Sequence, residues 1–282
     1  MLLGAHVQKL KKELEEILEG REAENHLRIL LEYYLGLDRV DQVLRAKEKV
    51  AEDKIEKIQE AVDFLKVGKP IDYILNESIF WGFPFYVDEN VLIPRPETEE
   101  LVLLIMDNED ENEDLEVLDI GTGSGCIPIA LKYEREKMQI DACDISVEAL
   151  KVAERNAQSL EVAVHFFELD FINNLPNKKY DIVVSNPPYI EEEEIERLEK
   201  NVKEYEPIVA LTPFGDPLTF YRRMLEVADK ILKPGGRFYW EIHEDFGRET
   251  MALFEGEPYE EVELIQDMYA RHRMVRAVYV GK

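Results

Sequence analysis

The feature that most constrains the fold is an alternation of short apolar runs and helical stretches, which begins at Leu115 and continues to Val280. The apolar runs are rich in β-branched and aromatic residues, which is typical of strands buried on both faces. Strands that alternate with helices predict an α/β fold with a mostly parallel sheet, covered by helices on both sides. The predicted strands lie at 116–120, 139–143, 163–169, 180–185, 237–242, 261–266 and 273–280.

A glycine loop follows the first of these strands. Residues 121–125 read Gly-Thr-Gly-Ser-Gly, and the next predicted helix begins at Cys126. Glycines let the backbone turn tightly and approach a ligand closely. A pyrophosphate site favours the spacing GxGxxG, whereas GxGxG better suits a nucleoside that carries an amino-acid tail. Asp119, just before the loop, is a candidate for binding the ammonium group of such a tail, directly or through water.

Acidic and aromatic residues follow the next two strands. Asp144 comes at the end of the second strand, where a carboxylate accepts hydrogen bonds from both ribose hydroxyls. Asp170 and Phe171 end the third strand. The carboxylate is a candidate acceptor for the adenine amino group, and the ring is a candidate for packing on the base, with core packing as the alternative for Phe171. Because parallel strands end at one edge of a sheet, these residues and the loop predict a single nucleoside site.

The fourth strand runs directly into Asn186, Pro187, Pro188 and Tyr189. Consecutive prolines have fixed φ and no N–H, so they predict a rigid, extended turn that leaves the carbonyls of Asn186 and Pro187 as hydrogen-bond acceptors. The Asn186 side chain adds another acceptor, and Tyr189 adds a flat aromatic face. This set suits a planar group that bears an NH2, such as a carboxamide or the exocyclic amine of a base. An ordinary strand-to-loop turn is the alternative.

Residues 1–74 predict a small helical bundle. Apolar side chains recur four times at helical spacing, and Gly20 is placed to end the first helix. Asp38 is placed to cap a short helix that carries Val40 and Leu44. The bundle is interpreted either as helices that only bury one another or as a substrate-docking domain.

Residues 75–95 predict a linker between this bundle and a larger domain at 96–282. Their aromatic run, 79–87, is punctuated by glycine and proline, which is typical of a β-hairpin. Pro96 and the acids that follow it predict the start of a helix.

Composition limits the classes of function. The net charge of −27 repels phosphate backbones and argues against broad nucleic-acid binding. The chain has no apolar run long enough to span a membrane, so no transmembrane helix is expected. Cys126 and Cys143 are the only cysteines, and they lack the spacing of metal ligands, so no metal site is expected. This cysteine usage also fits a reducing cytoplasm. His243 and Glu244 could form an acid/base pair, but a helix start is the favoured interpretation.

Several stretches resemble known enzymes. Together with Asp144, residues 118–125 and the Lys-Pro-Gly-Gly at 233–236 resemble class I S-adenosylmethionine-dependent methyltransferases. The run 184–190, Val-Ser-Asn-Pro-Pro-Tyr-Ile, narrows the resemblance to enzymes that methylate a planar nitrogen. Stretches at 68–74, 92–99 and 206–211 resemble the HemK/PrmC family, the N5-glutamine methyltransferases of peptide chain release factors. The resemblance covers nearly the whole chain.

This resemblance implies a Rossmann-like class I methyltransferase fold with a seven-stranded sheet, a helical N-terminal domain and a hairpin linker. It also implies a cytoplasmic enzyme that uses S-adenosyl-L-methionine and releases S-adenosyl-L-homocysteine. The expected substrate is the glutamine of the Gly-Gly-Gln motif in class 1 peptide chain release factors, with no direct partner in a membrane or nucleic acid. The expected catalytic residues are Asn186, Pro187, Pro188 and Tyr189. The expected cofactor residues are Asp119, Gly121, Thr122, Gly123, Ser124, Gly125, Asp144, Asp170, Phe171 and Asn186.

Three other interpretations stay open at this point. Glutamine methylation of a ribosomal protein would use the same motifs. Methylation of adenine N6 or guanine N2 would place an exocyclic amine in the same turn, although the net charge of −27 and the lack of a basic recognition segment count against it. A non-catalytic adaptor with a vestigial cofactor fold is the alternative of a different class.

Overall fold

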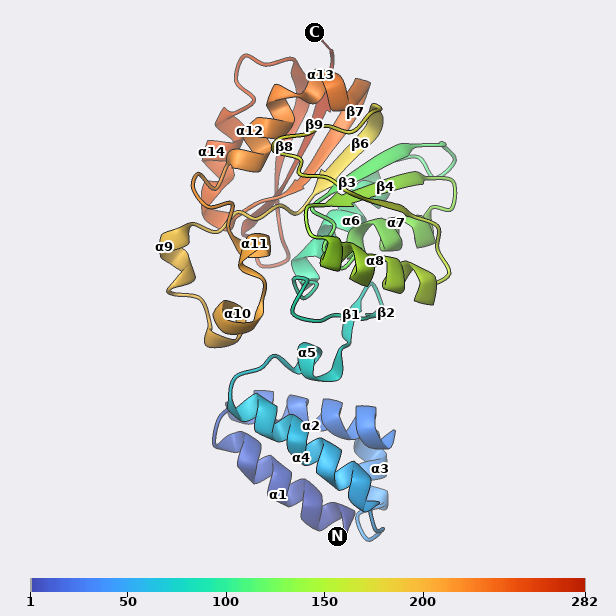
Figure 1. The fold of residues 1–282 in the computed structure, drawn as a ribbon, viewed down its shortest axis with the longest axis vertical. Coiled ribbons are helices and arrows are strands. Elements are labelled where there is room, and N and C mark those ends of the chain that lie inside the picture. Colours follow the sequence, from blue (N-terminus) through green and yellow to red (C-terminus); the bar gives the residue numbers. More distant parts are fainter. Residues whose placement is uncertain (1, 282) are drawn as a thin grey trace. The chain divides into compact units, whose positions relative to one another are not determined.

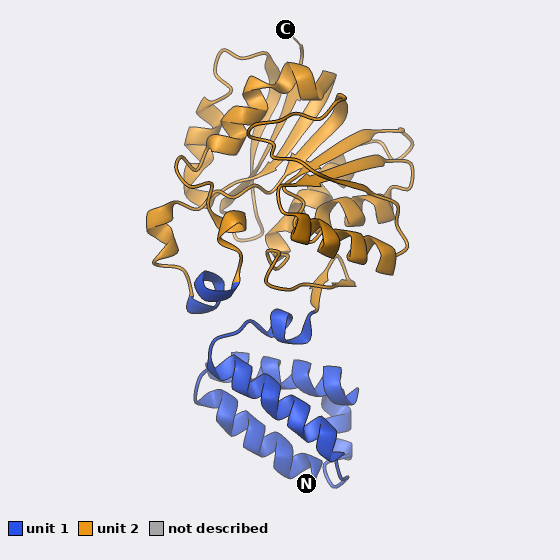
Figure 2. Ribbon diagram, in the orientation of Figure 1, with its two compact units in different colours: residues 1–76, 200–205 blue, residues 77–199, 206–282 orange. Residues whose placement is uncertain are grey.

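The computed structural model describes residues 2–281, and the chain divides into two compact units (Figure 2). Unit 1 extends to Asn76 and also takes in the short stretch Lys200–Tyr205. Unit 2 takes in Glu77–Glu199 and the chain from Glu206 onward. All the predicted strand tips belong to unit 2.

Unit 1 is built from helices. Their bounds are α1 Leu3–Glu15, α2 Gly20–Leu35, α3 Arg39–Leu44, α4 Glu52–Lys66 and α5 Ile71–Leu75, with α10 Lys200–Tyr205 joining them from the later part of the chain. Leucines of α1 and α2 interdigitate with Ile58, Ala61 and Val62 of α4 to form one buried core. The predicted bundle is therefore present, and its core is made by the long helices.

The structure corrects two expectations about this bundle. Gly20 begins α2 instead of ending the preceding helix, which already stops at Glu15. Asp38 does cap α3, because its side chain accepts from the N–H groups of Val40 and Asp41. However, Val40 is 63% exposed and Leu44 is 77% exposed, because the six-residue α3 is too short to present a continuous buried stripe.

Unit 2 contains the predicted seven-stranded sheet, and its mostly parallel character is confirmed (Figure 1). The strand order is β5-β4-β3-β6-β7-β9-β8. Within residues 2–281, the pairs β7–β9 and β9–β8 of this sheet are antiparallel, and its other neighbouring strands are parallel. The bounds are β3 Glu116–Ile120, β4 Gln139–Asp144, β5 His165–Glu168, β6 Tyr180–Ser185, β7 Leu232–Glu241, β8 Tyr259–Gln266 and β9 His272–Tyr279.

The register brings the carboxyl ends of the central strands level with one another. Ile120, the last residue of β3, lies opposite Cys143 of β4 and Ser185 of β6. Ser185 in turn lies opposite Trp240 of β7. Consequently, the residues that follow these strands emerge side by side along one edge of the sheet.

Helices cover both faces of the sheet, as Figure 1 shows, and two buried cores lie between them and the strands. One core packs α6 Pro96–Asn108, α7 Cys126–Glu134 and α8 Val147–Ser159 together with the hairpin β1 Ser78–Phe80 and β2 Phe83–Phe85. The other core packs α12 Thr219–Glu226, α13 Ala228–Ile231 and α14 Gly247–Ala252. The remaining short elements of unit 2 are α9 Glu192–Ile195, α11 Ile208–Leu211 and the 3-10 helix η1 Glu244–Phe246.

The strand predicted at 237–242 begins earlier in the structure. Leu232 already pairs with Tyr180 and Arg237 pairs with Ile182, so the stretch 233–236 forms a bulge inside β7. Before this strand, the helical stretch is divided at Val227 into α12 and α13. Within residues 2–281, no helix combines the length and the apolar character needed to cross a membrane.

Asn156 of α8 fastens the hairpin and the glycine loop to the rest of unit 2. Its Oδ1 accepts from the N–H of Tyr86 at 2.7 Å, and its Nδ2 donates to the carbonyl of Tyr86 at 3.0 Å. The same Nδ2 donates to the carbonyl of Ser124 at 2.9 Å. Asn156 is 1% exposed, so water does not replace these bonds if the side chain is lost.

We therefore expect Asn156→Ala to lower the free energy of unfolding by about 3 kcal/mol, because three buried backbone groups lose their partner. Urea unfolding followed by circular dichroism measures this change. Gln158→Ala, at an exposed position of the same helix, is the matched control and should stay within about 0.5 kcal/mol of wild type. Equal effects of the two substitutions would contradict the role given to Asn156.

Candidate active site

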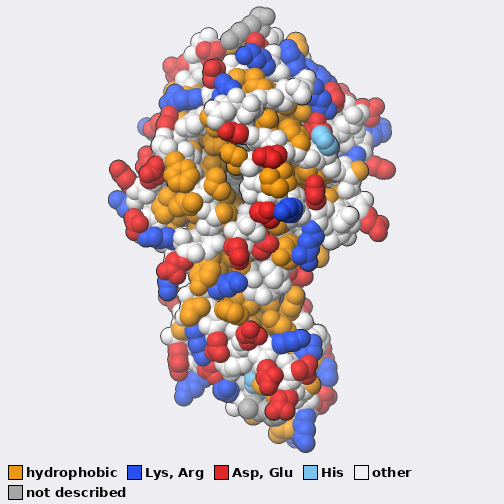
Figure 3. All heavy atoms as spheres, viewed as in Figure 1, with side chains coloured by type: hydrophobic (Ala, Val, Ile, Leu, Met, Phe, Trp, Pro, Cys, Tyr) orange, Lys and Arg blue, Asp and Glu red, His pale blue; other side chains and the backbone are white. Residues whose placement is uncertain are grey.

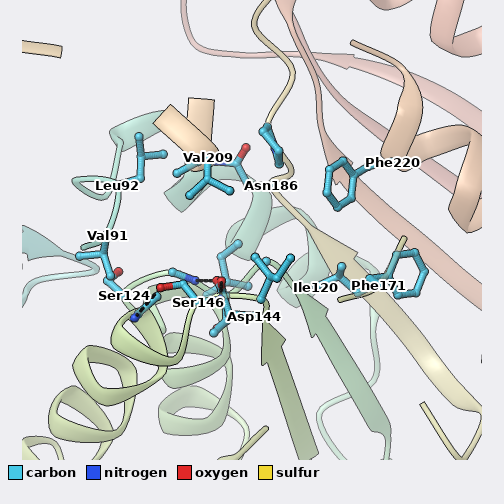
Figure 4. Close-up of a pocket in the computed structure, with 18 of the residues that line it drawn as sticks. Val91, Leu92, Ile120, Ser124, Asp144, Ser146, Phe171, Asn186, Val209 and Phe220 are labelled. Atoms are coloured by element: carbon cyan, nitrogen blue, oxygen red, sulfur yellow. Dashed lines mark hydrogen bonds between the residues drawn. The ribbon is translucent and has the colours of Figure 1, made fainter. Parts of the chain in front are cut away.

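A cavity of about 220 Å³ lies in unit 2 at the carboxyl ends of the central strands. In Figure 4, Asp144 and Ser146 lie below this cavity, Asn186 lies above it, and Phe171 and Phe220 lie together on one side. Most of the predicted site residues line it, namely Gly121, Thr122, Gly123, Ser124, Asp144, Asp170, Phe171, Asn186 and Pro188. The sheet edge thus gathers the glycine loop, the acidic tips and the proline turn around one space.

The glycine loop has backbone angles that side chains disfavour. Gly121 and Gly123 have φ of +75° and +53°, and a Cβ at either position would meet no atom within 4 Å. Backbone conformation, and open space toward the cavity, therefore explain these two glycines. Gly125 differs, because a Cβ there would lie 3.0 Å from both the Ala153 Cβ and the Ile129 Cδ1. It lets α7 pack closely on α8 and does not itself line the cavity.

Asp144 holds the glycine loop to the start of α8. One carboxylate oxygen accepts from the N–H of Gly123 and the other from the N–H of Ser146, each at 2.9 Å. The Ser146 hydroxyl then accepts from the N–H of Ala149 and caps the start of α8. Burial raises the pKa of the Asp144 carboxyl, and the backbone N–H groups oppose that rise. Each oxygen keeps a further lone pair for a ligand hydroxyl.

Asp119 lies in β3, fully buried and outside the cavity lining. Neither of its carboxylate oxygens has a well-formed hydrogen bond within residues 2–281. Burial raises the pKa of this carboxyl to about 7, while the Thr122 hydroxyl favours the ionised form and the charge of Asp144 disfavours it. A buried carboxylate without a well-formed hydrogen bond, beside the loop, is consistent with a cationic ligand group in its vicinity.

Asp170 and Phe171 line the cavity but also serve the local structure. The Asp170 carboxylate accepts from the N–H groups of Ile172 and Asn173 and from the side chain of Asn173. It therefore shapes its own turn. Phe171 is 3% exposed and belongs to a buried core, which confirms core packing for this ring. It also lines the cavity, and its contact with a base stays a prediction.

The proline turn contributes to the cavity at only some of its positions. Asn186 and Pro188 line the cavity, whereas Pro187 is buried and Tyr189, which is partly buried, lies just outside the lining. The Tyr189 hydroxyl donates to Oε1 of Glu241 at 3.0 Å. The Asn186 Nδ2 donates to the Thr98 hydroxyl at 3.2 Å.

Thr98 and Glu241 are buried partners of this turn. Thr98 lies in the first turn of α6, and its hydroxyl donates to Oε2 of Glu241 at 2.7 Å. Glu241 ends β7, and its backbone carbonyl accepts from the Tyr221 hydroxyl at 2.8 Å. Thr98 is 3% exposed and Glu241 is 2% exposed.

The remaining candidates have structural roles. His243 caps η1 by accepting from the N–H of Asp245, which confirms the predicted helix start. Cys126 and Cys143 are free and buried, and burial raises the pKa of the Cys126 thiol to about 12. Within residues 2–281, no three His, Cys, Asp or Glu side chains are grouped so as to hold a metal ion.

The cavity has an apolar rim. Val209 of α11 and Phe214 line the cavity and remain 45% and 61% exposed, and the neighbouring Ile208 is 45% exposed. Figure 3 shows hydrophobic side chains gathered on this face of unit 2, with acidic side chains scattered among them. The rim therefore offers apolar surface to whatever approaches the cavity.

Known proteins match both parts of the chain. The PrmC N-terminal domain family matches residues 7–75, and the Methyltransferase small domain family matches residues 98–201. The release factor glutamine methyltransferase of Flavobacterium psychrophilum is 40% identical over 98% of this chain and 99% of its own length. The chain belongs to the release factor glutamine methyltransferase family. The resemblance drawn from the sequence motifs is confirmed.

Other relatives agree with this family. The release factor glutamine methyltransferase of Bacillus subtilis is 38% identical, over 92% of this chain and 92% of its own length. Among solved structures, a methyltransferase from Pyrococcus furiosus matches with a TM-score of 0.52, covering 82% of this chain and 100% of that chain. At 16% identity, the latter similarity shows the class I methyltransferase fold alone.

The sequence motifs did not point to two residues beside the proline turn, Thr98 and Glu241. The signal for Glu241 was a single acid within the apolar stretch 238–242, which predicts a buried carboxylate in need of partners. Thr98 gave no comparable signal, because a threonine in the first turn of a helix is common. Its importance depends on Glu241, which is 143 residues away in the sequence.

The raised pKa of Asp119 predicts a pH dependence of stability. The unfolded chain ionises this carboxyl near 3.8, whereas the folded protein holds the proton up to about pH 7. The stabilising contribution is therefore present below pH 3.8 and is lost as the pH rises through about 7. Relative to Asp119→Asn, the wild-type protein should lose stability over this range, by up to about 4 kcal/mol.

Urea unfolding of both proteins at several pH values from 4 to 8 measures this difference. Other titrating groups are shared by the two proteins and cancel in the comparison. A difference that is independent of pH would show that Asp119 titrates normally.

Proposed function

We propose that this protein transfers a methyl group from S-adenosylmethionine to the side-chain amide nitrogen, N5, of the glutamine in the Gly-Gly-Gln motif of class 1 peptide chain release factors. The observation that carries the proposal is the placement of Asn186 and Pro188 on the same cavity as the glycine loop and Asp144. The names of the relatives support the substrate. A release factor acts in the cytoplasm, so we place the reaction there.

The cavity suits the cofactor by its donor and acceptor groups. Asp144 would accept from the ribose hydroxyls with the lone pairs that Gly123 and Ser146 leave free. Asp119 would balance the ammonium group of the amino-acid tail, directly or through water, because its carboxylate has no other well-formed partner within residues 2–281. Asp170 and Phe171 would contact the adenine. When bound, the cofactor supplies an electrophilic methyl group on its sulfonium.

The proline turn would hold the acceptor amide. A carboxamide nitrogen is a poor nucleophile, because its lone pair is delocalised into the carbonyl. The acceptors on Asn186 and Pro187 would take the two N–H groups and direct the nitrogen toward the methyl group. Pro188 and the ring of Tyr189 would bound the plane of the amide, and the hydrogen bond to Glu241 fixes that ring. Positioning in a preorganised polar site then accounts for most of the catalysis.

Proton removal requires no strongly basic side chain in this account. The nitrogen becomes acidic as it gains the methyl group, so its proton is lost readily after transfer. The apolar rim formed by Ile208, Val209 and Phe214 suits the glycine-rich loop of a protein substrate better than a phosphate backbone. The net charge of −27 acts in the same direction.

Incubation with labelled S-adenosylmethionine tests the proposal when purified release factor, ribosomal protein and nucleic acid are offered in parallel. Label should appear in the release factor, and peptide mapping should place it on the glutamine. Label on nucleic acid or ribosomal protein alone would contradict the proposed substrate. Calorimetry distinguishes an enzyme from a non-catalytic adaptor, since a failure to bind S-adenosylmethionine would favour an adaptor.

Asn186→Ala should lower the rate of methyl transfer by about 10²-fold, because one acceptor for the substrate N–H is lost from a preorganised site. Single-turnover kinetics with saturating cofactor measures the rate. Asn108→Ala, at an exposed position at the end of α6, is the matched control and should leave the rate unchanged. Near-wild-type turnover in Asn186→Ala would remove Asn186 from the mechanism.

A further inference from the structure

We propose that Glu241 is a positioning residue which, through Thr98, sets the orientation of the Asn186 side-chain amide, so that its oxygen faces the cavity. The inference rests on the proposed function, in which that oxygen accepts an N–H from the substrate amide. Neither Glu241 nor Thr98 needs to touch the substrate for this role. Their effect is to decide which end of Asn186 is offered to it.

The direction of the hydrogen bonds begins at the Glu241 carboxylate. Its two oxygens each accept a hydroxyl, from Thr98 at 2.7 Å and from Tyr189 at 3.0 Å. In both hydrogen bonds the hydroxyl is the donor, so both hydroxyl hydrogens point toward the carboxylate. Glu241 therefore removes the rotational freedom of the Thr98 hydroxyl.

That hydroxyl then selects one orientation of Asn186. Because the Thr98 hydrogen is directed at Glu241, the Thr98 oxygen is left as an acceptor for a neighbouring group. The Asn186 Nδ2 donates to it at 3.2 Å. The flipped amide would set two acceptor oxygens against each other. The amide oxygen is thus on the side away from Thr98, at a residue that lines the cavity.

Burial makes this selection strong. Thr98 and Glu241 are 3% and 2% exposed, so water is a poor substitute for any member of the network. Burial raises the pKa of the Glu241 carboxyl, while the hydrogen bonds from Thr98 and Tyr189 and the charge of Arg273 favour its ionised form. The backbone is also fixed, because β6 and β7 pair up to Ser185 and Trp240, the residues just before Asn186 and Glu241.

Two substitutions test the network with little change in shape. Thr98→Val removes the hydroxyl, and Glu241→Gln replaces one acceptor with a donor, which lets the Thr98 hydroxyl turn toward Asn186. Each should lower kcat for release-factor methylation about tenfold and leave the KM for the release factor and the Kd for the cofactor within about twofold, because the lost interaction acts in the transition state. Thr98→Ser restores the hydroxyl and should recover most of the rate.

Thr250→Val is the matched control, because Thr250 is a fully buried threonine of α14 whose hydroxyl has no hydrogen-bond partner within residues 2–281. It should keep the wild-type kcat. Thermal unfolding of every variant confirms that the proteins compared are folded. Wild-type kcat in Thr98→Val or in Glu241→Gln would overturn the inference.

The decisive measurement uses the Asn186→Ala background. If Thr98 acts through Asn186, adding Thr98→Val to Asn186→Ala should cost less than about twofold in kcat. The same tenfold loss in both backgrounds would show an independent effect and overturn the inference alone. Absence of methyl transfer by the wild-type protein would instead overturn the proposed function, and the inference with it.

Discussion

The register of the parallel strands is the constraint on which the rest of unit 2 depends. Ile120 lies opposite both Cys143 and Ser185, so β3, β4 and β6 end at the same level. Backbone hydrogen bonds fix this register, and a slip by one residue would turn buried side chains to the opposite face. The loop that begins at Gly121, the carboxylate of Asp144 and the side chain of Asn186 therefore share one edge and one cavity.

The polar groups at this edge are held by bonds within the protein before any ligand binds. Asp144 binds the backbone at Gly123 and Ser146, and Asn156 binds the carbonyl of Ser124. Such contacts keep the loop in a conformation with positive φ that only glycine adopts readily. The site is preorganised in this sense, because little side-chain freedom remains to be lost on binding.

Burying an acid costs free energy unless its charge is compensated, and two of the buried acids of unit 2, Glu241 and Asp119, differ in their surroundings. Glu241 accepts two hydroxyls and lies near the positive charge of Arg273, and these contacts oppose the rise in its pKa that burial causes. Asp119 has no well-formed partner within residues 2–281, and its pKa rises to about 7. Protein groups therefore surround the Glu241 carboxylate, whereas for Asp119 a cationic ligand group is the partner that we propose.

The sequence by itself determined the type of fold and the positions of the strand tips, because apolar periodicity, glycine spacing and proline rigidity act over a few residues. It identified Asp144 and Asn186 in this way, and it also predicted the family. Tertiary structure decided what each side chain contacts. Val40, for example, was expected in a core and is exposed. Thr98 meets Glu241 across 143 residues of sequence, and a hydrogen bond between residues so distant is set only when a helix and a strand pack together.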